Sequence, residues 1–313
     1  MIGWNFPSNN FGKEDGLNDP GIETFRGNPL WSLAREINQN TCDASDRDTK
    51  KPVEVHFELL DLAAEEFPDA RRFAEILESC GKYWSDNANT SKFFRNALTV
   101  MRRRKIPLLK ISDYNTTGLL GSDKTHGSDW FKLTKSVGAS DKEGGAGGSF
   151  GIGKHAPFAC SDIRTVFYGT KDKAGKTAFQ GVSKLVTHKS GKAETTQGTG
   201  YYGVAEKNIP IVSVDGIDRF FRRDRVGTDV FVAGFHAYDD WADEVAKSVL
   251  ENFFVAIHEG RLIVRVGDVL LNKTSLPELI KQHASAGPDY TAHAYFDALT
   301  ADEAAFFSED DFE

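Results

Sequence analysis

Hydrophobic and polar residues along this chain follow two periods, one typical of helices and one typical of strands. The helical period predicts helices over residues 30–44, two stretches within 62–104, 241–258 and 276–283. The strand period and short apolar runs predict strands over residues 52–60, 106–112, 164–168, 179–187, 228–233, 262–266 and 269–271. Because helices and strands mix without regular alternation, the pattern favours an α/β (α+β) two-layer sandwich over a doubly wound parallel sheet.

Other segments lack this periodicity and help to divide the chain. Residues 1–30 are rich in Asn, Gly, Pro and aromatic residues, which predicts an N-terminal arm. Residues 119–150 are polar and glycine-rich, and a loop of that length inside a compact domain is typical of a functional lid. The tail after residue 286 shows no clear element. We therefore expect a main domain over 31–235 with a helical insertion at 62–104, and a C-terminal extension over 236–313.

Composition narrows the class of protein. The 313 residues are 40% hydrophobic and 12% aromatic, enough to form a sizeable core. A net charge of −8 gives no overall attraction to nucleic acid, and we interpret the basic run 102–105 as a solvated helix end. The three cysteines and eight histidines lack metal-ligand spacing, which disfavours a metal-dependent hydrolase. With no signal peptide or membrane-length apolar run, we expect a cytoplasmic protein without a membrane partner.

A first polar row lies on the helix predicted over 30–44. Glu36, Asn40 and Asp43 stand at positions i, i+4 and i+7, so they share one face of that helix. Two carboxylates and an amide in one row suit capture of Mg²⁺ together with a general base. The same spacing also occurs on plain exposed helix faces.

Two further segments place polar groups at strand ends. Asp113 follows a hydrophobic strand, where its carboxylate can accept a hydrogen bond from an amine such as that of adenine. Asn115 and Gly118 permit a tight backbone turn beside a ligand, although an ordinary Asx turn fits equally well. Thr228 opens a later strand after a glycine and can place a hydroxyl in the same pocket.

The remaining segment is glycine-rich. Glycines between Gly147 and Gly153 let backbone N–H groups approach phosphate oxygens, and the apolar run that follows predicts a helix with its N-terminus toward the anion. Residues 148–154 also match the G-x-x-x-x-G-K pattern of a P-loop. However, His155 stands where a P-loop needs Ser or Thr, and the preceding residues are polar rather than a hydrophobic strand. A P-loop enzyme is therefore the weaker alternative.

Taken in order, the four segments resemble the GHKL superfamily of ATP-binding domains, which have the Bergerat fold. The resemblance covers residues 30–233, about two-thirds of the chain: E-x-x-x-N-x-x-D-A, then an Asp-to-Gly turn, a glycine-rich lid ending G-x-x-G-x-G, and Gly-Thr on a strand. The turn departs from the family pattern, because Asn115 replaces a glycine and one extra residue precedes Gly118. The resemblance implies a mixed sheet with helices on one face.

The resemblance also implies roles for the motif residues, with ATP and Mg²⁺ as cofactors. Glu36 would polarise the attacking water, and Asn40 would bind Mg²⁺. Asp113 would accept the amine of adenine, with Thr228 helping through a water. The other residues implied to contact the nucleotide are Asp43, Asn115, Gly118, Gly148, Gly151, Ile152, Gly153 and Lys154.

Within the superfamily, the pair Asp43-Ala44 after Asn40 favours the hydrolysing branch of gyrase B, the ninety-kilodalton heat-shock chaperone, MutL and MORC proteins. We therefore expect an ATPase rather than a protein kinase of the histidine-kinase-like branch. The resemblance further implies an ATP-dependent homodimer that exchanges its N-terminal arm, a transducer-like start within 236–313, and coupling to an effector protein or nucleic acid. Analogy alone suggests bacterial antiviral defence or repair. A nucleotide-gated binding module with negligible hydrolysis is the other alternative.

Overall fold

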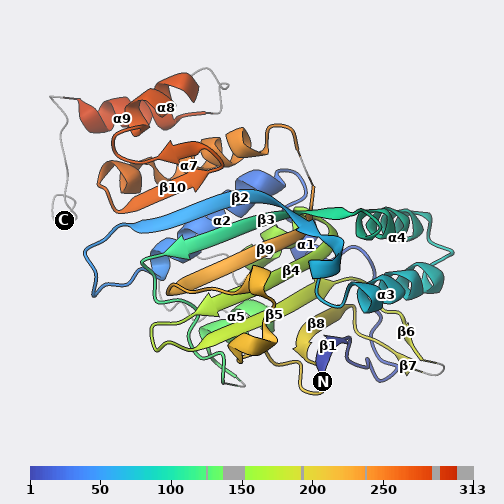
Figure 1. Cartoon of the computed structure of the whole chain (residues 1–313). Coiled ribbons are helices and arrows are strands. Elements are labelled where there is room, and N and C mark those ends of the chain that lie inside the picture. Colours follow the sequence, from blue (N-terminus) through green and yellow to red (C-terminus); the bar gives the residue numbers. More distant parts are fainter. Residues whose placement is uncertain (125, 137–151, 192–193, 237, 284–289, 302–313) are drawn as a thin grey trace, which may run out of the picture.

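The fold is built around a nine-stranded mixed sheet (Figure 1). The computed structural model describes residues 1–124, 126–136, 152–191, 194–236, 238–283 and 290–301. The sheet strands are β1 (Ile2–Asn5), β2 (Val53–Ala63), β3 (Lys105–Tyr114), β4 (Ser161–Lys171), β5 (Thr177–Lys184), β8 (Thr199–Val204), β9 (Gly227–Phe235), β10 (Leu262–Val266) and β11 (Val269–Leu271). Their order in space is β1-β8-β5-β4-β9-β3-β2-β10-β11, and β10 runs parallel to β2 while the other described pairs are antiparallel.

Helices and short connecting elements surround this sheet. The described helices are α1 (Pro20–Glu23), α2 (Pro29–Asp43), α3 (Ala70–Tyr83), α4 (Ala88–Met101), α5 (Asp129–Thr134), α6 (Ala156–Ala159), α7 (Trp241–His258), α8 (Leu276–His283) and α9 (Ala292–Thr300). Four 3₁₀ turns, η1 (Ala64–Glu66), η2 (Gly153–His155), η3 (Val214–Gly216) and η4 (Arg219–Phe221), and a small hairpin of β6 (Lys189–Ser190) and β7 (Glu194–Thr195) complete it. The mixed α+β architecture expected from the hydrophobic pattern is confirmed.

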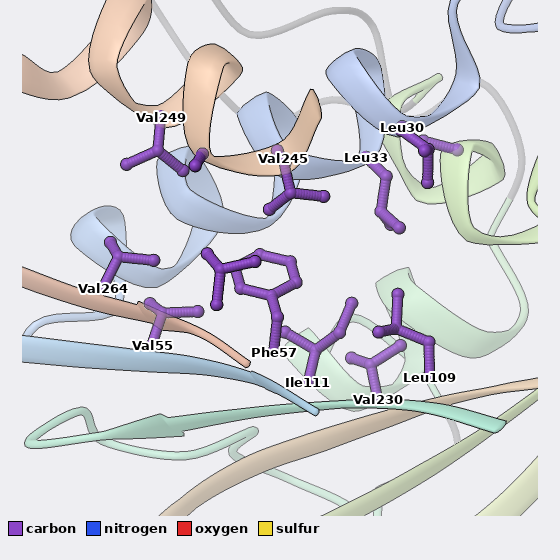
Figure 2. Close-up of a cluster of buried hydrophobic side chains, with 14 of the residues drawn as sticks. Leu30, Leu33, Val55, Phe57, Leu109, Ile111, Val230, Val245, Val249 and Val264 are labelled. Carbon is purple, nitrogen blue, oxygen red and sulfur yellow. The ribbon is translucent and has the colours of Figure 1, made fainter. Parts of the chain in front are cut away.

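One face of the sheet is covered by α2 and α7. Leu33 of α2 and Val249 of α7 point toward the sheet, where Phe57 and Ile111 rise to meet them (Figure 2). All four side chains are almost fully buried. Removing that much apolar surface from water is the main favourable contribution to folding, roughly 25 cal/mol per Å². This packing fixes α2, and with it the polar row on α2, against the sheet.

The opposite face carries a second helical layer, which differs from the expectation that helices lie on one face. Phe73 and Leu77 of α3 and Phe94 of α4 join a separate core with Leu62 and Leu108. Strand residues alternate between the two faces. The α3–α4 insertion begins at the end of β2 and has its own apolar face. It buries that face against the side of the sheet that α2 does not cover.

The predicted N-terminal arm is part of the sheet. Its first residues form β1, which pairs with β8 of the same chain from Ile2↔Val204 onward. Trp4 is 7% exposed, and its indole N–H donates to the carbonyl of Pro68 at 2.8 Å. Trp4, Phe6 and Phe25 of the arm are therefore core residues of the chain that carries them, whereas Phe11 is exposed.

The predicted C-terminal extension also completes the main fold. β10 pairs with β2, and α7 packs against α2, so residues 241–271 belong to the same sheet and core as residues 31–235. The tail, predicted to lack an element, contains α9. Glu251 of α7 caps this helix by accepting the backbone N–H groups of Thr291 and Ala292. Within the described part of the chain, no helix is long and apolar enough to cross a membrane.

Candidate functional site

Glu36 lies on α2 where the helix meets the glycine-rich segment. Its side chain is buried at 7% residue exposure, and one carboxylate oxygen pairs with Arg35 at 3.0 Å. A Cβ placed on Gly153 would overlap Oε2 of Glu36 and come 2.7 Å from its Cδ. The carboxylate therefore rests on the backbone at the end of the lid, and only glycine leaves room for it there. The first and third motifs are in direct contact.

Asn40 and Asp43 continue the polar row toward the end of α2, and both are exposed. The end of this helix is bonded to the turn of the second motif. Thr117 N–H donates to the carbonyl of Ala44 at 3.0 Å, and Asp46 N–H donates to the carbonyl of Asn115 at 3.1 Å. These two bonds hold the metal-ligand candidates beside the turn that follows Asp113.

Asp113 and Thr228 stand on neighbouring strands and are directly joined. The backbone N–H of Thr228 donates to Oδ1 of Asp113 at 2.9 Å, and the Thr116 hydroxyl donates to the same oxygen at 2.6 Å. No group in the described ranges donates to Oδ2. Burial raises the pKa of the Asp113 carboxyl, although the Thr116 hydrogen bond and the Arg223 guanidinium oppose that effect. The second and fourth motifs thus form one polar unit with a free acceptor.

This unit faces the α2 side of the sheet. Asp113 has the parity of Ile111 along β3, and Thr228 has the parity of Val230 along β9. Ile111 and Val230 belong to the core beneath α2 (Figure 2). Because side chains on one strand alternate between faces, the two motif residues point to the same side as these core residues. The described residues of the four motifs therefore gather on one face of the sheet.

Arg223 also contacts this unit, although no sequence pattern pointed to it. Its guanidinium donates to the backbone carbonyl of Asp113 and pairs with the carboxylate of Asp229. It also donates to the carbonyl of Thr228 at 3.2 Å. Gly227 allows this close approach, because at its φ of 133° an added Cβ would fall 2.6 Å from Oδ1 of Asp113. In the sequence, Arg223 is hidden in a basic run that looks like a solvated loop.

Asn115 and Gly118 shape the turn rather than present side chains to the site. Asn115 adopts a left-handed backbone with φ of 60°, and its amide donates to the carbonyl of Pro52 at 2.7 Å. Gly118 has φ of 67°, and a Cβ there would approach the Cα of Asp172 to 2.9 Å. Their contribution to a ligand is therefore the path of the backbone. The departure of Asn115 from the family pattern is compatible with this role, since Asn tolerates the left-handed region.

Lys154 supplies positive charge at the end of the glycine-rich segment. Its ammonium donates to the carbonyl of Lys132 at 2.8 Å. Burial, together with the charge of Lys184, lowers the pKa of Lys154 to about 8. Ile152 and Gly153 lead into η2 and the four-residue α6, so the helix predicted after the glycines is only a short turn. Gly148 and Gly151 lie outside the described residues, as do residues 125 and 137–150 of the predicted lid; the described part of the lid contains α5.

Other features of the described ranges do not coincide with this site. A cavity of about 220 Å³ lies between β1, α3 and the β6–β7 hairpin, and none of the motif residues lines it. No cluster of three or more His, Cys, Asp or Glu side chains able to hold a metal occurs among the residues described.

Comparison with known proteins adds no relative: protein-family models give no match, and neither does a search of curated proteins.

Proposed function

We propose that the motif face between α2 and the β3–β9 strand pair binds ATP with Mg²⁺ and hydrolyses it. The observation that carries this proposal is the pairing of motifs distant in sequence: Glu36 against Gly153, and Asp113 against Thr228. Each pair joins a carboxylate to a glycine-flanked backbone segment. The arrangement supplies an acceptor for a base amine at one end and a carboxylate beside a phosphate-binding backbone at the other.

Recognition of adenine falls to Asp113. Its Oδ1 already accepts the Thr228 N–H and the Thr116 hydroxyl, which fixes the carboxylate plane. Oδ2 is then the acceptor for the exocyclic amine of adenine. A guanine base presents a carbonyl at that position, so the same oxygen would face another acceptor and reject it.

Phosphate binding and hydrolysis fall to the other pair. Backbone amides around Gly153 and the ammonium of Lys154 would hold the β- and γ-phosphates, as amides and lysines do in other phosphate sites. Asn40 would bind Mg²⁺ through its amide oxygen, with phosphate oxygens and waters completing the shell, and Asp43 would support this region. Glu36 would orient a water and accept its proton as the water attacks the γ-phosphate.

The test is Mg·ATP binding by calorimetry together with phosphate release. Asp113→Asn should lose binding by at least tenfold. Glu36→Gln should keep binding within a few-fold and lose turnover by about 100-fold or more, the usual scale for removing a general base. Asp268→Asn and Glu278→Gln, on exposed residues far from the motifs, serve as matched controls. Normal ATP binding by Asp113→Asn would contradict the proposal.

Three alternatives remain for the same site. A nucleotide-gated switch would bind ATP tightly with negligible phosphate release in the wild type. A kinase of the histidine-kinase-like branch would transfer the γ-phosphate to a partner protein. A P-loop enzyme would lose binding in Lys154→Ala while Asp113→Asn bound normally. The geometry favours hydrolysis over these, because a buried carboxylate lies against the phosphate-binding backbone.

ATP binding would be coupled to assembly in this proposal. We expect an ATP-dependent homodimer in the cytoplasm, acting on an effector protein or nucleic acid, with antiviral defence or repair as the role. The pairing of β1 with β8 of its own chain means that arm exchange would first have to break this edge pairing. Sedimentation with a non-hydrolysable ATP analogue tests the dimer, and a monomer under saturating analogue would contradict it.

A further inference from the structure

The helix α4 and the residues that follow it carry only basic charged residues, on a chain that is acidic as a whole. Residues 88–105, which comprise α4 and the start of β3, contain six Lys or Arg residues and no Asp or Glu. The whole chain has a net charge of −8. All six cations are exposed: Lys92, Arg95, Arg102, Arg103, Arg104 and Lys105. We call them the α4 basic surface.

The cations lie in a row rather than at random. Lys92, Arg95 and Arg102 are spaced i, i+3 and i+10, which keeps them on one side of α4 while Phe94 and Ala97 face the core. From residue 92 to residue 103 the helix and its end extend about 16 Å at 1.5 Å per residue. Figure 1 shows α3 and α4 together at one end of the molecule, opposite the end that holds α8 and α9. The row therefore lies on an accessible projection.

Most of these charges are not neutralised by the chain. Arg102 approaches Glu78 at 4.0 Å, and Lys105 pairs with Asp61 at 3.1 Å. Within the described ranges no ion pair involves the other four: Lys92, Arg95, Arg103 and Arg104. A structural purpose explains only part of the row. Cations favour the last turn of a helix through its dipole, but Lys92 lies in the first half of α4 and Arg95 lies at its middle, so both are outside that last turn.

Such a row slightly destabilises the free chain, because like charges three or four residues apart repel by a few tenths of a kcal/mol. A polyanion would reverse this effect. We propose that the α4 basic surface binds the phosphate backbone of nucleic acid. A B-DNA duplex carries one negative charge per about 1.7 Å of axis, so a 16 Å row meets several phosphates at once. The inference rests on the charges of this surface and does not depend on the proposed nucleotide site.

Fluorescence anisotropy of the full chain with a labelled 20-base-pair duplex, from 50 to 200 mM salt, tests this. The triple variant Arg95→Gln/Arg103→Gln/Arg104→Gln should bind at least tenfold more weakly at 50 mM salt. Its log–log salt slope should be shallower by about two to three, close to 0.9 for each lost phosphate contact. The charge-retaining triple Arg95→Lys/Arg103→Lys/Arg104→Lys should stay within about threefold of wild type, because the backbone contact is mainly coulombic.

The matched control removes three exposed lysines elsewhere on the chain: Lys207→Gln/Lys273→Gln/Lys281→Gln. It has the same net charge as the glutamine triple and should bind within about twofold of wild type. Absence of duplex binding by the wild type at 50 mM salt would overturn the proposal, and so would equal losses in the two glutamine triples. Displacement of the duplex by polyglutamate at equal charge would overturn the assignment to a phosphate backbone.

Discussion

The carboxylate of Glu36 and the backbone of Gly153 occupy adjoining space, and a side chain on Gly153 would overlap Oε2 of Glu36. The two residues are separated by most of the first half of the chain, yet α2 and η2 bring them together. The obstacle that an added Cβ would meet is the end of a flexible side chain. The fold can therefore accept such a change by moving Glu36.

Gly153→Ala should accordingly impair turnover more than folding. Displacing the carboxylate by about 1 Å is expected to lower the rate of ATP hydrolysis on the order of 100-fold. The free energy of unfolding should fall by less than about 1 kcal/mol, since the clash is relieved by rotation of a side chain. Phosphate release and urea unfolding measure the two effects. Gly27→Ala is the control, because a Cβ there has nothing within 4 Å, and it should change neither.

The pH dependence of ATP affinity should follow the protonation state of Lys154. Its pKa is lowered to about 8, so the free protein loses this positive charge as the pH rises through 8. ATP affinity should then decrease between pH 7 and 9, and the decrease should be smaller in Lys154→Met. Calorimetry at pH 8 in buffers of different ionisation enthalpy should detect proton uptake on binding. Equal pH profiles for wild type and variant would exclude Lys154 as a phosphate ligand.

The titration of Lys154 should also change the free energy of unfolding with pH, but in the opposite direction to ATP affinity. Because the pKa of Lys154 is lower in the folded protein than the ordinary value of 10.5, the unfolded chain binds more protons between pH 8 and 10.5. The contribution of Lys154 to the free energy of unfolding therefore rises across that window. Under the proposed function ATP binding should weaken over the lower part of the same window, so the two measurements distinguish a ligand role from a general loss of structure.

Asp113→Asn should remove ATP binding without destabilising the protein. Burial raises the pKa of Asp113 above its ordinary 3.8, so the folded state binds more protons than the unfolded state and loses stability as the pH rises from about 4. Asparagine keeps the acceptor for Thr228 N–H and has no charge to bury. The free energy of unfolding of the variant relative to wild type should increase from pH 4 to pH 7 in urea titrations. A constant difference would show that the carboxyl titrates normally.

Arg223→Met should destabilise the protein strongly. The change leaves the carboxylate of Asp229, 3% exposed, buried without its ion-pair partner, and removing one partner of such a pair typically costs about 3–5 kcal/mol. Combining it with Asp229→Asn should recover part of that loss. Arg225→Met, which removes an exposed arginine over the ring of Tyr114, should change the free energy of unfolding by less than about 1 kcal/mol. Urea unfolding at pH 7 measures the free energy of unfolding of all three variants. If Arg223→Met lost no more stability than Arg225→Met, the buried ion pair between Arg223 and Asp229 would be contradicted.

The sequence predicted the elements whose period is strong and local. The helices α2, α7 and α8 and the strands β2, β3, β9 and β10 lie where the pattern places them, within a few residues. β1 and β8 escaped prediction because they are short and contain Gly3, Gly200 and Gly203, which interrupt the apolar pattern. α9 was also not predicted, because a nine-residue helix beside a polar tail shows too few turns for a clear hydrophobic period.

Strand pairing between distant parts of the chain also could not be predicted from the sequence. No local pattern reveals that β10 lies beside β2, so residues beyond 235 looked like an extension instead of part of the sheet. In the site, the motif residues could be chosen from spacing, but the contact of Glu36 with Gly153 depends on the packing of α2. Arg223 could not be recognised at all, because its role comes from carbonyls that only the folded strands bring together.

The early strands β1 and β2 each pair with a strand that is made much later in synthesis. Ile2 pairs with Val204, and Val53 pairs with Leu262, so each pairing joins residues about 200 positions apart. At 5–20 residues per second, the first strands of a nascent chain would wait roughly 10–40 s for their partners. During that interval the edge of β2 and the aromatic face of β1 are open to other chains. We therefore expect slower synthesis to increase aggregation of this protein, because the early strands would remain unpaired for longer.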